Sequence, residues 1–293
     1  MNFKQFIPPI IFDVYQRLIS SKNTKYKIGK YRIEIPPNFA LPGFQKKFKL
    51  YDRFLPVLVS KFEPEKTIID VGANVGDTTI AMIQKCKNRI ICIEPSLVFL
   101  PFLEKNLSKL PFEDQQKTAI IKKLVGTGSI SGELTHTNGS TAHVRIVEGA
   151  NTHTPLDDLI TDIANVILLK VDTDGFDFDV IRSAQKILSA SEPILYWENE
   201  IAENFQYKGF DELYVFLAKH GYCYIYVFDN FGNLITEEHD FETLKNINTY
   251  IYSMKKNECT RTIYYVDVLA VTKKNYLVVK NAIDTYKTEW IKK

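Results

Sequence analysis

From residue 66 onward, runs of apolar β-forming residues alternate with segments of helical periodicity. Strands are predicted at 67–71, 89–93, 119–125, 166–171, 194–197, 223–228 and 264–271. Helices are predicted between them at 78–85, 96–110, 155–162, 178–188 and 211–219. Because a strand that is apolar along its whole length must be covered on both faces, this alternation indicates a layered arrangement. The pattern therefore predicts an α/β fold in which a mostly parallel, seven-stranded sheet carries helices on both faces.

Three segments stand outside this alternation. Residues 1–60 are predicted to form an N-terminal extension, with a short hairpin at 26–35 and a helix within 50–59. Residues 126–153 and 229–262 are predicted to be inserts that are long enough to act as functional loops, with a hairpin at 132–147. The main domain is expected to span residues 61–293 and to contain both inserts.

Charge and cysteine usage exclude several classes of protein. A net charge of +2 with scattered lysines provides no basic face for nucleic acid. The four cysteines form no C-x-x-C pair and no metal-like spacing, so a reducing, cytoplasmic setting is expected. No apolar stretch reaches the roughly 18 residues that span a bilayer. The oligomeric state is left open by the sequence.

The first twenty residues carry an amphipathic pattern. The apolar residues at helical spacing are Phe6, Ile7, Ile10, Ile11, Val14 and Leu18. Such a stripe can pack against its own domain or make peripheral contact with a membrane surface, and both interpretations stay open. Lys4 and Arg17 give only weak support to the membrane contact.

The strongest single motif is DVGANVGD at residues 70–77, between a predicted strand and a predicted helix. So tight a turn requires glycine where φ is positive or where a ligand approaches the backbone. A dinucleotide fingerprint would need glycine at 72, 74 and 77, and a P-loop would need Gly-Lys-Ser/Thr; neither pattern is present. The two flanking carboxylates suit instead a ligand that carries a sulfonium and an ammonium group. The residues predicted to bind this ligand are Asp70, Gly72, Ala73, Asn74, Gly76 and Asp77.

An acidic residue at the end of the next predicted strand completes this prediction. Glu94 follows Gly76 by eighteen residues and precedes Pro95. A carboxylate in this position can accept hydrogen bonds from both hydroxyls of a ribose, as the acidic residue of dinucleotide folds does. The glycine loop and Glu94 together predict S-adenosylmethionine as the cofactor.

With these residues the sequence resembles the FkbM family of methyltransferases, over roughly residues 50–272. The segments that carry the resemblance are DVGANVGDTT, IEPS, LVGTGSISGEL, NGSTAHV, TPLDDLI, LLKVDTDGFDFDVIRSA, PILYWE, FDNFG and YYVDVLAV. The resemblance implies a Rossmann-like class I methyltransferase fold, S-adenosylmethionine as methyl donor, and usually O-methylation of a sugar or secondary metabolite. It also implies that Pro95, Ser96 and Gly126 contribute to cofactor binding. The family more often has Asp-x-Glu-Gly-x-Glu where this chain has DTDGFD at 172–177, which shortens both later carboxylates.

Four residues are candidates for catalysis. Asp172 is predicted at the carboxyl end of the fourth strand, where open α/β sheets bind ligands, and Lys170 points to the same face. Glu198 ends the fifth strand and is either a base, an acceptor-binding group or part of a structural pair. His143, in the 126–153 insert, has a side chain suited to accept a proton near neutral pH.

The acidic turn at 172–177 has two further interpretations. Asp174 and Gly175 suit a turn that initiates a helix, which would give the motif a structural role. Asp172, Asp174 and Asp177 are also spaced partly like a calcium loop, but no glutamate completes it at the twelfth position. We expect no metal here.

The sequence thus predicts an S-adenosylmethionine-dependent O-methyltransferase that acts on a sugar or glycan hydroxyl, or on a related small molecule. The alternatives are a nitrogen or carboxylate acceptor on the same fold, or a noncatalytic module that binds the nucleoside. A cytoplasmic enzyme is expected, with peripheral membrane contact through residues 1–20 as an open option.

Overall fold

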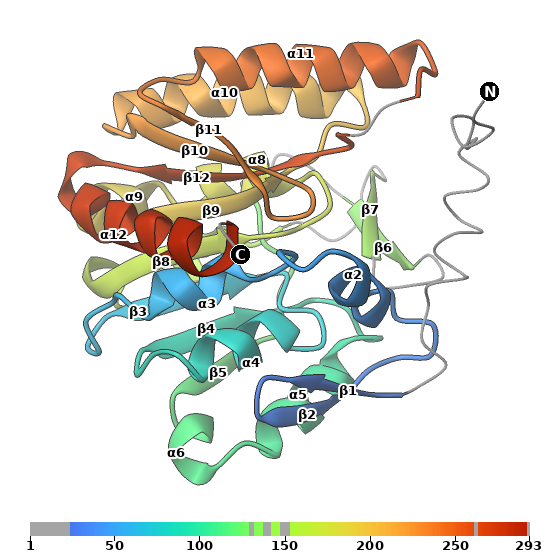
Figure 1. The fold of residues 1–293 in the computed structure, drawn as a ribbon, viewed down its shortest axis with the longest axis vertical. Helices are drawn as coiled ribbons and strands as arrows, with labels where there is room; N and C mark the ends of the chain where they lie inside the picture. The colour runs from blue at the N-terminus through green and yellow to red at the C-terminus, as the bar shows by residue number, and fades with distance from the viewer. Residues whose placement is uncertain (1–23, 129–131, 137–141, 147–152, 261–262, 292–293) are drawn as a thin grey trace.

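A computed structural model describes residues 24–128, 132–136, 142–146, 153–260 and 263–291 (Figure 1). The side chains of residues 132–136 and 142–146 are not described. Its centre is an eight-stranded sheet in the order β11-β10-β12-β9-β8-β3-β4-β5. Five neighbouring strands are parallel to one another: β5 (Thr118–Ile121), β4 (Arg89–Ile93), β3 (Thr67–Val71), β8 (Val166–Val171) and β9 (Ile194–Asn199). The predicted α/β fold class is confirmed.

The other edge of the sheet is antiparallel. β12 (Val266–Val271) pairs antiparallel with both β9 and β10 (Tyr224–Asp229), and β10 pairs antiparallel with β11 (Leu234–Glu238). The prediction of seven strands was therefore wrong by one. The additional strand, β11, lies in a segment that was expected to be a loop. It was not predicted because it is an edge strand whose residues alternate between half-buried and exposed, without the apolar run of a central strand.

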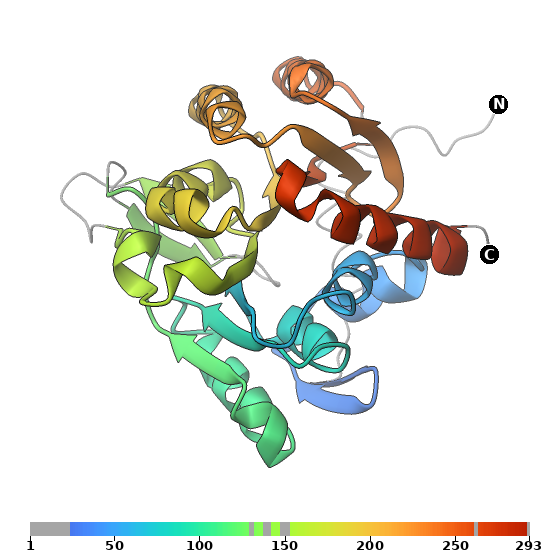
Figure 2. The ribbon, with the colours of Figure 1, turned by 90° about the vertical axis from the view of Figure 1, so that its left-hand side faces the viewer.

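Helices cover both faces of the sheet, as predicted (Figure 2). One face packs against α3 (Phe54–Val59), α4 (Asp77–Ile83), α5 (Leu100–Ser108) and α12 (Tyr276–Tyr286). The other packs against α7 (Leu156–Leu159), α8 (Asp177–Arg182), α9 (Gln185–Ser191), α10 (Asn204–Lys219) and α11 (Glu242–Lys256). Successive strand residues alternate between the two cores: Ile68 belongs to the first and Ile69 to the second.

The described part of the N-terminal extension shares the first of these cores. The expected hairpin is present as β1 (Lys25–Ile28) and β2 (Tyr31–Glu34), and α2 (Leu41–Lys47) follows it. Ile33 and Leu58 are buried together with residues of α4 and α5. Asn106 on α5 exchanges two hydrogen bonds with the Glu34 backbone and donates a third to the Val75 carbonyl. The domain boundary near residue 60 stays a prediction, and the amphipathic residues 1–20 lie outside the described residues.

The two predicted inserts contain regular structure. β6 (Gly132–His136) and β7 (Ala142–Ile146) pair antiparallel, which confirms the expected hairpin. In the second insert, α11 is held by a buried network in which the Asn248 amide donates to the Tyr214 hydroxyl and accepts from Asn199. Within the described ranges, no helix has both the length and the apolar character needed to cross a membrane.

Candidate active site

The polar residues singled out above gather at the carboxyl ends of the parallel strands. Chain order reverses at β3, since β4 follows it toward one edge of the sheet while β8 and β9 lie toward the other. Such a switch point opens a crevice between the two diverging loops. The strand register aligns Cys92, Asp70, Lys170 and Tyr196 in one row across four strands. The row lies on the face covered by α3, α4 and α12.

The glycine loop after β3 has the backbone strain that its sequence predicts. Gly72, Asn74 and Gly76 have φ values of 76°, 49° and 84°. The amides of Gly72 and Ala73 both donate to the Ile93 carbonyl at the end of β4. A β-carbon on Gly72 would lie 1.9 Å from the Asp172 carbonyl oxygen. Gly72 is therefore required for the close approach of the loops that follow β3 and β8, whatever ligand binds there.

Glu94 is fixed against the glycine loop. Its two carboxylate oxygens accept hydrogen bonds from the Asn74 amide at 2.8 Å and the Ser96 amide at 2.7 Å. Burial raises its pKa, although the same two amides act in the opposite direction. Each oxygen retains lone pairs for further donors such as ribose hydroxyls. Pro95 is half-buried beside it, and the Ser96 hydroxyl accepts the Val98 amide.

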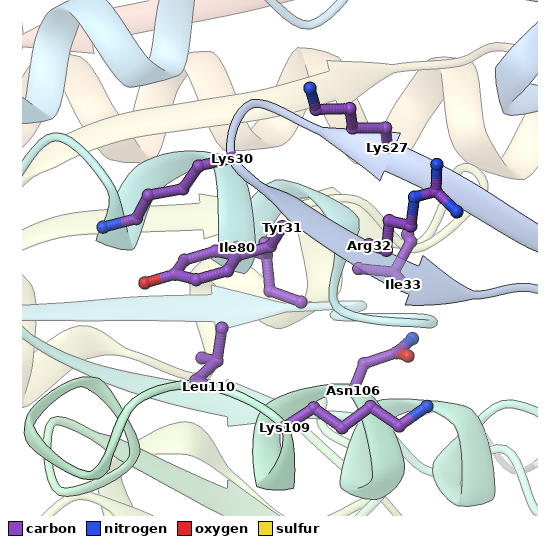
Figure 3. Close-up of a pocket in the computed structure, with 9 residues that line it drawn as sticks. All are labelled: Lys27, Lys30, Tyr31, Arg32, Ile33, Ile80, Asn106, Lys109 and Leu110. Carbon is purple, nitrogen blue, oxygen red and sulfur yellow. The ribbon is translucent and has the colours of Figure 1, made fainter.

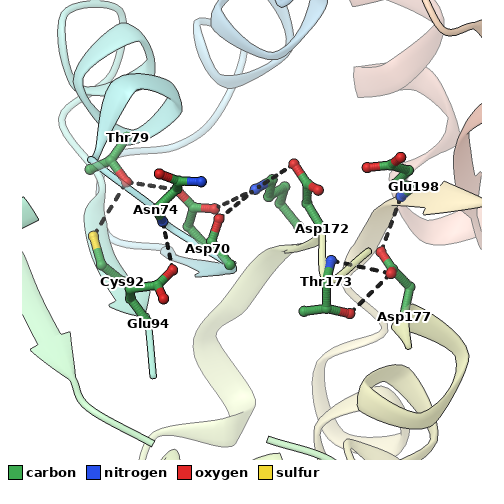
Figure 4. Close-up of polar contacts among 11 residues, drawn as sticks. Asp70, Asn74, Thr79, Cys92, Glu94, Asp172, Thr173, Asp177 and Glu198 are labelled. Carbon is green, nitrogen blue, oxygen red and sulfur yellow. Dashed lines mark hydrogen bonds and ion pairs between the residues drawn. The ribbon is translucent and has the colours of Figure 1, made fainter. Parts of the chain in front are cut away.

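A buried ion-pair network links β3 to β8 (Figure 4). Lys170, 4% exposed, has its Nζ 3.0 Å from Asp70 Oδ1 and 3.3 Å from Asp172 Oδ2, and it donates to the Gly72 carbonyl. Thr79 Oγ1 donates to the other Asp70 oxygen at 2.6 Å. Because both oxygens of Asp70 are engaged inside the protein, we interpret this residue as one that positions the loop. Its predicted contact with the cofactor stays a prediction.

The side chain of Asp172 is 47% exposed, which makes it the accessible member of the network. Its neighbour Glu198 is half-buried, and burial together with the adjacent Asp172 carboxylate raises the pKa of Glu198 well above its usual range. Glu198 therefore holds its proton more tightly than a free carboxyl group does. The structure brings the predicted Asp172, Lys170 and Glu198 together at one point of the cleft.

Asp177 has a structural position. It is completely buried, and it accepts hydrogen bonds from the Thr173 amide, the Thr173 hydroxyl and the Glu198 amide. It thereby ties the end of β8 to the end of β9, as Figure 4 shows. Asp174 adopts a left-handed φ of 53° within the same turn, just before α8. These features agree with the helix-initiating interpretation of the DTDGFD motif.

Two predicted site residues lie on or beside the 126–153 insert. Gly126 is buried, and a β-carbon there would lie 2.3 Å from Asp179 Oδ2, so a larger residue would displace that side chain. Its cofactor contact stays a prediction. His143 is in strand β7, whose side chains lie outside the described part of the structure. Among the described residues, no group of three or more His, Cys, Asp or Glu side chains has an arrangement that could hold a metal ion.

Sequence reasoning missed Asp267. This residue, on β12, is paired directly with Glu198 across the antiparallel ladder, so both carboxyl groups lie on the cleft face. The signal was present in the last strand, where an acid interrupts the apolar run VDVLAV. The sequence alone could not assign Asp267 to the site, because its partner strand, β9, lies much earlier in the chain.

A cavity of about 410 Å³ lies elsewhere, between the β1–β2 hairpin and α5 (Figure 3). Its lining residues are Lys27, Lys30, Tyr31, Arg32, Ile33, Ile80, Asn106, Lys109 and Leu110. None of these residues follows the carboxyl end of a strand of the large sheet. We therefore do not place the active site in this cavity.

The residues of the cleft fit S-adenosylmethionine. Glu94 offers a carboxylate for the ribose diol, and the cleft acids offer negative charge to the sulfonium and ammonium groups. The left-handed turn at 72–76 keeps side chains away from its backbone at the two glycines. These carboxylates therefore fit a positively charged nucleoside better than a pyrophosphate.

Comparison with known proteins supports the same class. The methyltransferase FkbM domain matches residues 70–224, which is more than half of the chain. No curated protein matches significantly.

Parts of this chain also align with solved structures of methyltransferases. The methyltransferase FkbM from Methylobacillus flagellatus KT aligns with a TM-score of 0.40 and 19% identity, over 62% of this chain and 45% of that one. The chain therefore spans less than half the length of that protein. The O-methyltransferase from Bacillus cereus in complex with S-adenosylhomocysteine aligns with a TM-score of 0.43 and 13% identity, over 76% of this chain and 80% of that one.

The family assignment rests on the domain match, and the loop and cleft geometry agree with it. The predicted membership of the FkbM family and the predicted cofactor, S-adenosylmethionine, are confirmed at the level of the family. The chain belongs to the FkbM family of S-adenosylmethionine-dependent methyltransferases.

Proposed function

We propose that this protein methylates a hydroxyl oxygen of a sugar or glycan, with Asp172 as the general base. The observation that carries the proposal is the placement of Asp172, an accessible carboxylate held by buried Lys170 at the switch point of the sheet. The acceptor, the base and the O-methylation are all parts of the proposal.

Each residue of the cleft has a distinct task in this reaction. When bound, S-adenosylmethionine supplies an electrophilic methyl group. Asp172 accepts the proton of the acceptor hydroxyl, which makes the oxygen more nucleophilic. Lys170 fixes the orientation of Asp172, and Glu198 provides a further carboxyl group beside it. Orientation and proton removal are most of what the protein must add.

Four considerations support a sugar as the acceptor. Asp172, Glu198 and Asp267 offer several polar groups to hydroxyls, and the half-buried rings of Tyr51 and Tyr196 lie near these acids. Such a mixture of carboxyl groups and aromatic faces suits a polyol that also has apolar C–H surfaces. The 126–153 insert is rich in Ser, Thr, Asn and His, and members of the family often methylate sugars. The amphipathic residues 1–20 would keep the enzyme near lipid-linked glycans, and this is the weakest of the arguments for a sugar acceptor.

The Asp172→Asn variant tests the proposed base. Asparagine keeps the shape of the side chain but cannot take the proton, so we expect turnover to fall by about 100-fold or more. Affinity for S-adenosylmethionine should change much less. Release of S-adenosylhomocysteine is measured with nucleotide sugars and glycolipids, and in parallel with amines, catechols, carboxylic acids and peptides. Asp211→Asn, an exposed change on α10, serves as the matched control.

The same panel decides between acceptor classes. Methylation of sugars that depends on Asp172 supports the proposal. Robust methylation of an amine or a carboxylic acid, with none of any glycan, would contradict the acceptor class and leave the family assignment intact.

A further inference from the structure

A turn from the N-terminal segment lies at the carboxyl edge of the sheet. β10 and β9 run in the same direction, since each is antiparallel to β12, so the turn after β10 is at the edge that holds the cleft. The ring of Phe48 stacks on that of Phe231 in this turn, with centroids 3.8 Å apart. The Tyr286 hydroxyl donates to the carbonyls of both Gly232 and Leu50. The segment that follows α2 is thus anchored on the rim of the cleft.

Asp52 lies between two anchors of this segment. Leu50, two residues before it, contacts the β10 turn, and Phe54, two residues after it, packs against Tyr196 with ring centroids 6.1 Å apart. Tyr196 precedes Glu198 by two residues on the cleft face of β9. Asp52 has a left-handed φ of 58° and an exposed side chain, to which Gln45 donates a weak hydrogen bond at 3.5 Å. The anchors therefore place Asp52 at the same edge of the sheet as Glu198, between the β10 turn and Tyr196.

The electrostatic environment of Asp52 agrees with this placement. Asp52 keeps contact with solvent, but desolvation by the cleft walls, followed by repulsion from Asp77 and Asp172, raises its pKa to about 7. Lys170 acts in the opposite direction. The neighbouring Arg53 has its guanidinium near Gln45 and over the ring of Trp290. Asp52 therefore interacts electrostatically with an acid of the glycine loop and with Asp172 at the end of β8.

Negative charge exceeds positive charge among the described residues of this cleft. Lys170 is the cation that the acids share, and its shortest contact is with Asp70 at 3.0 Å. Asp52, Asp77 and Asp172 contribute three more carboxylates around it. S-adenosylmethionine carries a sulfonium charge that S-adenosylhomocysteine, the product of methyl loss, does not. The two molecules therefore differ by one positive charge in their interaction with these acids.

We propose that Asp52 is a specificity-determining residue that favours the sulfonium cofactor over the neutral thioether product. The negative cleft binds the charged donor more strongly, and it loses that attraction once the methyl group has left, which promotes product release. This role holds for any acceptor and does not depend on a sugar substrate.

The test is a pair of calorimetric titrations of full-length wild type and Asp52→Asn at pH 8.5, where Asp52, with its pKa of about 7, carries its negative charge. Asparagine tolerates the left-handed conformation and retains an oxygen for Gln45, so the backbone of the turn should be preserved. The ratio of the dissociation constants for S-adenosylhomocysteine and S-adenosylmethionine should fall by about fivefold, the size expected for two unit charges about 4 Å apart in water. The fall should come from weaker binding of S-adenosylmethionine. Asp211→Asn on α10 removes the same charge from the opposite face and should leave the ratio unchanged.

A third ligand separates charge from shape. An analogue with an ammonium group in place of the sulfonium should lose affinity in parallel with S-adenosylmethionine. The proposal would be overturned if the ratio of the two dissociation constants stayed within twofold of the wild-type ratio. It would also be overturned if the variant bound S-adenosylmethionine more weakly but bound the ammonium analogue, like S-adenosylhomocysteine, with unchanged affinity. Wild-type protein that binds neither cofactor form would contradict the cofactor assignment itself, which distinguishes that failure from failure of the Asp52 role.

Discussion

Lys170 is the residue on which the geometry of the cleft depends most. Burial acts to lower its pKa, but the nearby Asp70 and Asp172 outweigh this and raise the pKa above its usual value. Lys170 is therefore a permanent cation and cannot serve as a base. Removing one partner of such a buried pair costs about 3–5 kcal/mol, because it leaves the other charge uncompensated. The ammonium acts by holding the two loops and the Asp172 carboxylate in place.

Asp177 makes the stability of the protein depend on pH. Burial, followed by repulsion from Asp172, raises its pKa to about 7 in the folded state, against about 3.9 in an unfolded chain. Between these values the folded state binds one more proton than the unfolded state. This contribution to stability is complete below the unfolded pKa and is lost as the pH rises through about 7. The free energy of unfolding should fall by up to about 1.4 kcal/mol per pH unit in this window.

Urea unfolding of wild type and Asp177→Asn at pH 5, 6, 7 and 8 measures this contribution. The variant cannot ionise at this position, so its free energy of unfolding should depend less steeply on pH. Asp211→Asn, exposed on α10, should keep the wild-type slope. Parallel slopes for wild type and Asp177→Asn would show that Asp177 is ionised in the folded protein.

At the scale of secondary-structure elements, the turn after α2 is in close contact with the β10–β11 turn. Gly232 has a φ of 88°, and a β-carbon on it would lie 2.4 Å from the Leu50 carbonyl oxygen. The Tyr286 hydroxyl of α12 bridges the two turns through the carbonyls of Leu50 and Gly232. Three distant parts of the chain therefore meet at Gly232.

Gly232→Ala should destabilise the protein and move the N-terminal turn. The left-handed backbone costs about 1–2 kcal/mol for alanine, and the collision with Leu50 adds to it, so we expect a loss of about 2–4 kcal/mol. Gly221→Ala is a matched control, because Gly221 has a similar φ of 83° but its nearest neighbour would be 4.0 Å away. Denaturant unfolding compares the two variants. An equal loss in both would mean that the contact with Leu50 can be relaxed without cost.

At the scale of the whole molecule, the sequence predicted the parallel part of the fold well. Strands β3, β4 and β8 have the predicted bounds, because each is an apolar run that is buried on both faces. The switch point followed from their order, so the positions of Asp70, Glu94, Lys170 and Asp172 could be foreseen. The class I fold and the cofactor were foreseen from the same segments.

The remainder depended on contacts that no local pattern contains. Helix α10 begins at Asn204, seven residues before its predicted start, because Glu203 and Gln206 form a capping box that the periodicity did not indicate. Helix α11 was missed, since only three of its residues are buried and one of these, Asn248, is polar. Asp52 and Asp267 lack any motif. Asp52 is placed by the packing of its segment against the β10 turn and α12, and Asp267 is placed by the pairing of β12 with β9.

The central claim is that the β3 loop and Glu94 bind S-adenosylmethionine, and calorimetric titration of this cofactor tests it most directly. Wild type should bind, and Glu94→Gln should bind with a dissociation constant about 30-fold higher, which corresponds to roughly 2 kcal/mol for a charged hydrogen-bonding group. Glu104→Gln on α5, whose partner is Lys122 at the surface, should bind like wild type. Folding of each variant is checked by its thermal unfolding transition. A folded Glu94→Gln protein with unchanged affinity, or a wild-type protein that does not bind S-adenosylmethionine, would contradict the account.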